Sequence, residues 1–187
     1  MIIKKMRNAL KLGLAQKKRF QGGFTLIEVL VIIAIIVILS GVVFINYRSS
    51  EKTLALQRAA NKLAQDIRRV QEMAIAAQVC CGGTVPPGGY GIYLGNVNDT
   101  SYILYADKNN SGDYSPAGNE RIETINLEQG VKISLLNPSS PSINFKPPDP
   151  TITLTGGGPV EITLVLESDT SKTKKITVNK AGLVEIE

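Results

Sequence analysis

The chain lacks histidine and tryptophan altogether, and only two of its 187 residues are cysteines. Without histidine, neither a Ser-His-Asp triad nor an imidazole ligand to a metal can form. No phosphate-binding glycine loop is present either, because the glycines at 156–158 lie between two expected strands and read as a turn. We therefore predict that the protein is not an enzyme. Without tryptophan, tyrosine, phenylalanine and aliphatic side chains must fill its core.

Acidic residues are absent from the first 23 residues, although this segment holds seven lysines and arginines. The whole chain has 21 basic and 16 acidic residues, so residues 24–187 are left with 14 basic and 16 acidic ones. The overall positive charge therefore belongs to the leader and does not indicate nucleic-acid binding. Basic residues beside a membrane segment are retained in the cytoplasm, which places the C-terminal part outside.

A long apolar run extends from Phe24 to Ile45 and contains one ionisable residue, Glu28. A helix of about 20 apolar residues crosses the hydrocarbon core of a bilayer. We therefore expect residues 24–45 to form a single membrane-spanning helix in contact with lipid. A secretory signal is cut after its apolar region, near small residues, whereas here the small residues Gly22 and Gly23 precede it.

The string GFTLIEVLVIIAIIVIL, preceded by a basic leader, resembles the N-terminus of type IV pilins and of type II secretion pseudopilins. This resemblance implies that a prepilin peptidase removes residues 1–23 by cutting between Gly23 and Phe24, and that Phe24 is then N-methylated. It also implies a location in the bacterial inner membrane, with the N-terminus cytoplasmic and the C-terminal domain periplasmic, and later in a pilus or pseudopilus. Translation from Met6 instead of Met1 would keep the cleavage site intact.

Glycine before the cut bond lets the backbone lie close to an active site, because it has no side chain. Glu28 is costly in an apolar segment and needs a compensating partner. After cleavage it would lie in the first helical turn, where the helix dipole favours negative charge. The free amine of Phe24, on the same subunit or a neighbour, would be its positive partner during assembly with other pilins or pseudopilins.

The helical pattern continues beyond the apolar run, through residues 46–78, with an apolar face on one side. Without an internal proline, residues 24–78 are expected to form one helix, with Lys62–Asp66 and Arg68–Glu72 able to pair on its wet side. The apolar stripe would pack against a sheet, and a coiled-coil seam is the alternative. It consists of Leu56, Ala60, Leu63, Ile67, Val70, Ala74 and Ala77.

Residues 79–187 are expected to form an antiparallel β-domain, after glycines and prolines between 82 and 89 end the helix. The last three strands would form a meander with a turn at 179–182. The order of elements indicates an α+β pilin fold and resembles pseudopilin H and FimT-type minor pilins. Seven segments alternate between apolar and polar residues, and two more do so less regularly: 90–94, 101–105, 121–127, 131–136, 160–167, 174–178 and 183–187, then 142–145 and 151–154.

Two local patterns contain residues that could bind a metal or form a disulfide. The first has oxygen-bearing residues at alternate positions with a glycine at 112, as in a calcium loop, but position twelve of that template falls on Gly118. It is either a turn or a non-EF calcium loop, with Asp107, Asn109, Ser111, Asp113 and Glu120 as ligands. The second is the pair Cys80-Cys81, which would form either a bridge between neighbours or two thiols that are free or paired with another chain.

Three classes of function follow from these patterns. The first is a minor structural subunit of a type IV pilus or type II pseudopilus. The second is a filament-associated binding module that takes up DNA, and the third is an anchored exported domain unrelated to filaments. Phosphate contacts for DNA would come from Lys172, Lys174, Lys175 and Lys180, with Lys172 and Lys174 on one face of a strand.

Overall fold

The computed structural model describes residues 23–147 and 151–187, with the side chains of residues 42–49 outside the description. Contacts divide the chain into two units, Met1–Phe44 and Ile45–Glu187. One helix, α2 (Leu26–Ile75), begins in the first unit and ends in the second. The predicted leader lies outside the described residues except for Gly23.

Helix α2 is shorter than the predicted span of residues 24–78. It ends at Ile75 because Ala77 adopts a left-handed backbone conformation, with φ of 44°. The N–H of Gln78 then donates to the carbonyl of Met73 at 3.0 Å, which is the hydrogen bond that closes a left-handed helix cap. The prediction that the glycines after residue 81 end the helix was therefore wrong, because the cap forms before them.

In the second unit, the predicted stripe of α2 packs against the β-strands. Its members from Leu56 to Ala74 are buried, and only Ala77 is half-buried. Three further alanines, at positions 55, 59 and 64, widen the buried face and let strands approach closely. These residues belong to one core cluster with strands of both sheets, which confirms packing on a sheet.

All nine predicted strands are present. Strand β8 begins five residues earlier than predicted, because Asp169 and Thr173 still pair with β7. The strands are β1 (Gly89–Tyr93), β2 (Ser101–Asp107), β3 (Arg121–Asn126), β4 (Val131–Asn137), β5 (Ser142–Lys146), β6 (Thr151–Leu154), β7 (Val160–Leu166), β8 (Asp169–Val178) and β9 (Val184–Ile186).

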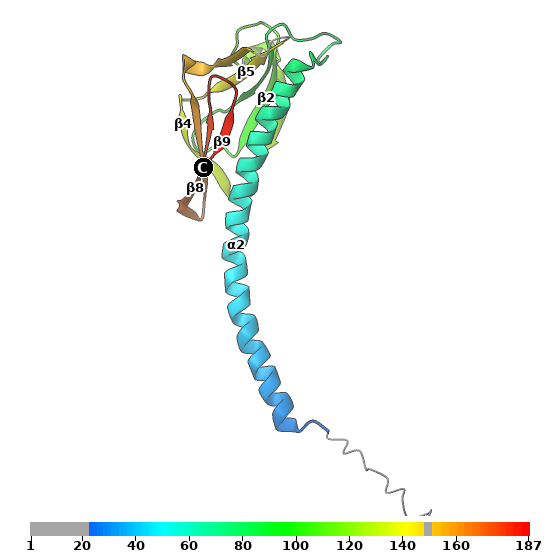
Figure 1. Ribbon diagram of the computed structural model, residues 1–187, viewed down its shortest axis with the longest axis vertical. Helices are drawn as coiled ribbons and strands as arrows, with labels where there is room; N and C mark the ends of the chain where they lie inside the picture. The colour runs from blue at the N-terminus through cyan, green and yellow to red at the C-terminus, as the bar shows by residue number, and fades with distance from the viewer. Residues whose placement is uncertain (1–22, 148–150) are drawn as a thin grey trace, which may run out of the picture. The chain divides into compact units, whose positions relative to one another are not determined.

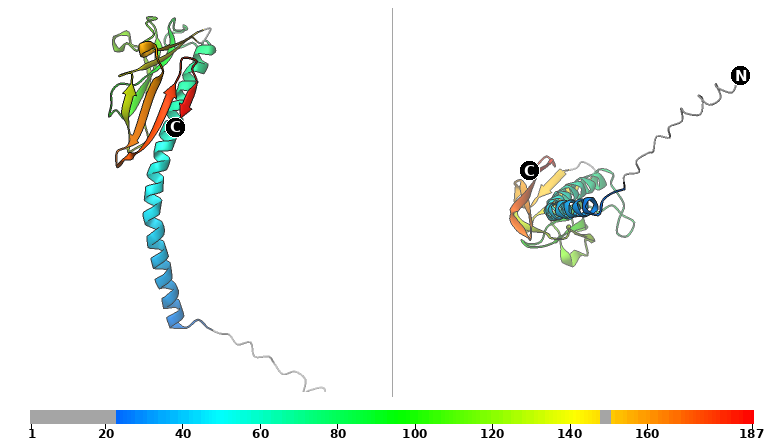
Figure 2. Two further views of the ribbon diagram at one scale, coloured as in Figure 1. Left: turned by 60° about the vertical axis from the view of Figure 1, so that its left-hand side comes forward. Right: turned by 90° about the horizontal axis from the view of Figure 1, so that it is seen from below.

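The strands form two antiparallel sheets, in the orders β3-β2-β1-β5-β6 and β4-β7-β8-β9. The predicted meander β7-β8-β9 is therefore confirmed, and Figures 1 and 2 show these strands beside the last part of α2. The connection between β1 and β2 joins the sheets, because Asn98 donates to the carbonyl of Ile133 at 2.8 Å. The fold is α+β, as expected.

Aromatic side chains take the place of tryptophan in the core. Tyr90, Tyr102, Tyr105 and Phe145 are the bulkiest buried residues. Tyr105 lies over Gly91, its partner on the next strand, where an added Cβ would come within 2.4 Å of the tyrosine ring. Glycine on β1 thus makes room for the large buried ring of Tyr105.

Candidate functional site

The predicted cleavage bond lies in exposed, non-helical backbone. Gly23, Phe24 and Thr25 precede α2, and Phe24 is 76% exposed. No atom lies within 4 Å of the position that a Cβ on Gly23 would occupy. Within the described chain, the Gly23 side of this peptide bond is therefore accessible to a peptidase.

Thr25 caps the helix that carries Glu28. Its hydroxyl oxygen accepts the backbone N–H of Glu28 at 3.3 Å, and its carbonyl accepts the N–H of Val29 at 3.2 Å. Thr-x-x-Glu is the sequence pattern of a capping box. Glu28 consequently lies in the first turn of α2, where the helix dipole favours a negative charge. The role of Thr25 was missed from the sequence, although this pattern could have revealed it.

The apolar side chains that follow Glu28 in the first unit are exposed. Leu26, Ile32 and Leu39 are 82%, 44% and 60% exposed, respectively. Within the described ranges, no helix combines the length and apolar character that crossing a membrane requires. The membrane-spanning role of residues 24–45 stays a prediction.

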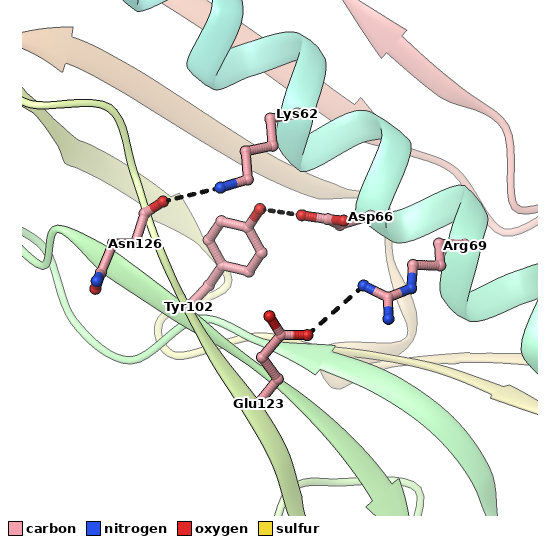
Figure 3. A network of polar contacts seen from close by, with 6 residues as sticks. All are labelled: Lys62, Asp66, Arg69, Tyr102, Glu123 and Asn126. Atoms are coloured by element: carbon pink, nitrogen blue, oxygen red, sulfur yellow. Dashed lines mark hydrogen bonds and ion pairs between the residues drawn. The ribbon is translucent and has the colours of Figure 1, made fainter.

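The polar side of α2 contacts the five-stranded sheet. Lys62 Nζ donates to the carbonyl of Asn126 at 3.4 Å, and the Tyr102 hydroxyl donates to Asp66 at 2.5 Å (Figure 3). Arg69 Nη1 lies 3.6 Å from Glu123 Oε2. Because both side chains are about half exposed, this ion pair contributes little to stability. The expected ion pairs Lys62–Asp66 and Arg68–Glu72 do not form among the described residues. Lys62 and Asp66 bind Asn126 and Tyr102 of the sheet instead.

We expect Tyr102→Phe to lower the free energy of unfolding by about 1 kcal/mol, because it removes one hydrogen bond to a carboxylate that water can still reach. Burial and the neighbouring Asp66 raise the pKa of Tyr102, so its hydroxyl stays a donor at neutral pH. Urea unfolding followed by near-ultraviolet circular dichroism measures the change. Tyr93→Phe is the matched control on β1, and an equal loss there would contradict the role of the Asp66 contact.

The four lysines proposed for DNA do not share one surface. Lys172 and Lys174 lie on the same face of β8 as buried Ile176, and Lys172 donates to Thr53 of α2 at 3.1 Å. Lys175 points to the opposite face and forms an ion pair with Glu161 at 2.6 Å, which lowers the pKa of that glutamate. Lys180 lies in the exposed turn before β9. DNA binding stays a prediction that nothing in this geometry favours.

Of the five residues predicted to bind calcium, the loop brings Asp107, Asn109 and Ser111 together, because the side-chain oxygens of Asp107 and Asn109 both accept the N–H of Ser111. The carboxylate of Glu120 accepts the N–H of Ser115 instead, and that of Asp113 accepts a hydrogen bond from Thr155 at 2.8 Å, a contact that the sequence did not indicate. No group of three or more His, Cys, Asp or Glu side chains is placed to hold a metal in the part of the chain that the structure describes.

The adjacent cysteines form a disulfide, Cys80–Cys81, in the turn between α2 and β1. Cys80 packs against the core while Cys81 is exposed. The sequence left open either a bridge between neighbouring cysteines or two thiols, and the structure contains the bridge. Such a bridge closes the shortest of loops and so constrains the unfolded chain little.

Comparison with known proteins finds two matching family models. The prokaryotic N-terminal methylation motif matches residues 18–44, and type II transport protein GspH matches residues 59–182. Neither description names an enzyme, and the absence of catalytic activity stays a prediction. No curated protein matches the chain.

Among solved structures, the type IV minor pilin FimU of Pseudomonas aeruginosa is 12% identical, with a TM-score of 0.45, over 71% of this chain and 92% of that one. The minor pseudopilin EpsH from the Type 2 Secretion System of Vibrio cholerae is 11% identical, with a TM-score of 0.40, over 71% and 95%. The GspH model spans well over half of the chain and follows directly on the methylation motif. The chain therefore belongs to the GspH family of type II transport proteins and carries a prokaryotic N-terminal methylation motif.

Proposed function

We propose that this protein is a minor subunit that joins a type IV pilus or a type II secretion pseudopilus after its leader is removed. The observation that carries the proposal is a methylation motif at residues 18–44 joined to a GspH domain at 59–182. A prepilin peptidase would cut between Gly23 and Phe24 and methylate the new terminus. The exposed backbone on either side of this bond supports such a cut.

The membrane and the filament would use the same helix in turn. Before assembly, residues 24–45 would cross the inner membrane once, with the basic leader in the cytoplasm and the second unit in the periplasm. During assembly, the exposed apolar side chains of α2 would leave lipid and pack against the helices of other pilins or pseudopilins. Purification of intact filaments with this subunit in them, bearing an N-methylated Phe24, tests the proposal.

Glu28 would serve assembly through its charge. A carboxylate in an apolar helix is costly, and the amine created at Phe24, on this subunit or its neighbour, would offset that cost. The cap at Thr25 holds Glu28 in the first turn, which is close in sequence to the new terminus. The charge would thus become favourable only when an amine partner is present.

We expect Glu28→Ala to reduce incorporation into sheared filaments at least tenfold while leaving the protein folded and membrane-bound. The substitution removes both the desolvation cost and the attraction to the amine, so insertion does not suffer. Immunoblots of sheared filaments and of membrane fractions measure the two quantities. Glu51→Ala, an exposed glutamate further along α2, is the control, and wild-type incorporation of Glu28→Ala would refute the electrostatic role.

A further inference from the structure

The disulfide Cys80–Cys81 lies in a turn that is open to solvent. Cys81 is exposed, as are Val79 before it and the two glycines that follow it. No atom lies within 4 Å of the position that a Cβ on Gly82 or Gly83 would occupy. Another molecule can therefore approach the bridge from the side of Cys81.

The two cysteines differ in how firmly the protein holds them. Cys80 is partly buried and packs against the core cluster. Its N–H donates to the carbonyl of Thr84 at 3.1 Å, and its carbonyl accepts the N–H of Gly83 at 3.2 Å. Apart from the disulfide, Cys81 forms no hydrogen bond or ion pair with the described residues. The fold thus fixes the position of Cys80, whereas the bridge holds Cys81.

The bridge joins two residues in an unfavourable arrangement. The φ of Cys81 is 45°, in the left-handed region that cysteine rarely adopts. The two Cα atoms are 3.8 Å apart because the residues are neighbours, whereas ordinary disulfides span roughly 4.4–6.8 Å. Opening the bridge would relieve both constraints. Together with the exposure of Cys81, they make this disulfide more reactive than an ordinary structural one.

We propose that Cys80–Cys81 is an exchangeable disulfide at which a thiolate attacks the sulfur of Cys81. The thiolate forms a new S–S bond with Cys81 as the bond to Cys80 breaks, and Cys80 leaves as a thiolate that takes a proton from water. A second thiolate can then attack the mixed disulfide. This step leaves two reduced cysteines in the protein and one disulfide that joins the two attacking thiols.

The fold should survive this exchange, because contacts outside the bridge hold both ends of the turn. Gln78 donates its N–H to the carbonyl of Met73 at 3.0 Å, and its own carbonyl accepts the hydroxyl of buried Tyr90. The bridge itself closes too small a loop to restrict the unfolded chain much. Reduction would therefore alter the exposed turn between α2 and β1 and leave the core in place.

The test treats the full chain, purified in detergent, with reduced glutathione and then blocks free thiols with excess N-ethylmaleimide. We expect about 5 mM glutathione to open most bridges within about an hour, and peptide mass spectrometry to find glutathione on Cys81 and maleimide on Cys80 in the intermediate. The Tm of the reduced protein should lie within about 2 °C of that of the oxidised protein. A bridge that opens only in urea, or an adduct chiefly on Cys80, would overturn the proposal.

Single-cysteine variants compare the two sulfurs directly. The Cys81 thiol of Cys80→Ser should react with N-ethylmaleimide about tenfold faster than the Cys80 thiol of Cys81→Ser, because reactivity follows exposure. Equal rates in the two folded variants would contradict attack at Cys81. If either variant fails to fold, the adduct map of the wild type decides between the two sulfurs.

The attacking thiolate could belong to a small molecule or to a protein. A thioredoxin-type reductase whose resolving cysteine is replaced by serine distinguishes them, because it cannot release its mixed disulfide. A covalent complex through Cys81 would identify a protein thiol as the source, and a glutathione adduct without such a complex would identify a small thiol. Either product supports exchange at Cys81, and the absence of both would refute it.

Discussion

Replacing Gly23 with valine is expected to abolish removal of the leader. If a peptidase must bring the backbone of residue 23 close to its own carboxylates, a branched side chain there blocks the approach, because only glycine has no Cβ. Nothing in the described chain lies within 4 Å of that Cβ position, so valine would not disturb the protein's own fold. Any loss of cleavage then reports on the peptidase and not on misfolding.

The measurement is the intact mass of the product after co-expression with a prepilin peptidase. Wild type should begin at Phe24 with one added methyl group, and Gly23→Val should keep its leader. Gly41→Val is the matched control, because this glycine is also surrounded by open space but lies well inside α2. A normal Phe24 terminus from Gly23→Val would remove the assignment of the cleavage site.

Truncating Leu63 to alanine is expected to cost about 3 kcal/mol of unfolding free energy in the second unit. Leu63 lies in the middle of the α2 stripe, is fully buried and belongs to the core cluster shared with both sheets. Removing a buried leucine side chain loses its transfer free energy and leaves a cavity, a combination that costs roughly 2–5 kcal/mol. The helix on one side and the strands on the other limit how far this site can collapse.

Urea unfolding of the full chain in detergent measures the effect through the near-ultraviolet signal of its tyrosines, all of which lie between residues 47 and 114. Leu54→Ala is the control on the same helix, since Leu54 is 52% exposed and should lose no more than about 0.5 kcal/mol. Equal losses at the two positions would mean that the stripe does not anchor α2 to the sheets.

Local sequence patterns determined the elements of this protein and their order. Each of these patterns lies within one continuous segment of the chain. They are the apolar run with a single acid, the apolar stripe at helical spacing, and the strand segments that alternate between apolar and polar residues. For this reason the helix, all nine strands and the final meander could be predicted. The methylation motif is also local, so it indicates a pilin or pseudopilin from the sequence alone.

Tertiary structure alone decided which residues meet. The placement of β1 between β2 and β5 depends on pairing across long stretches of chain, which no local pattern encodes. Lys62 and Asp66 were expected to pair because they are four residues apart. Instead, they form hydrogen bonds with Asn126 and Tyr102 of the sheet, respectively. Likewise, the spacing of Asp107 and Glu120 could not show that both would be buried, or that one oxygen of Glu120 would have no hydrogen-bond partner among the described residues. Burial and partner choice are set by the segments that pack over a residue, and these come from distant parts of the chain.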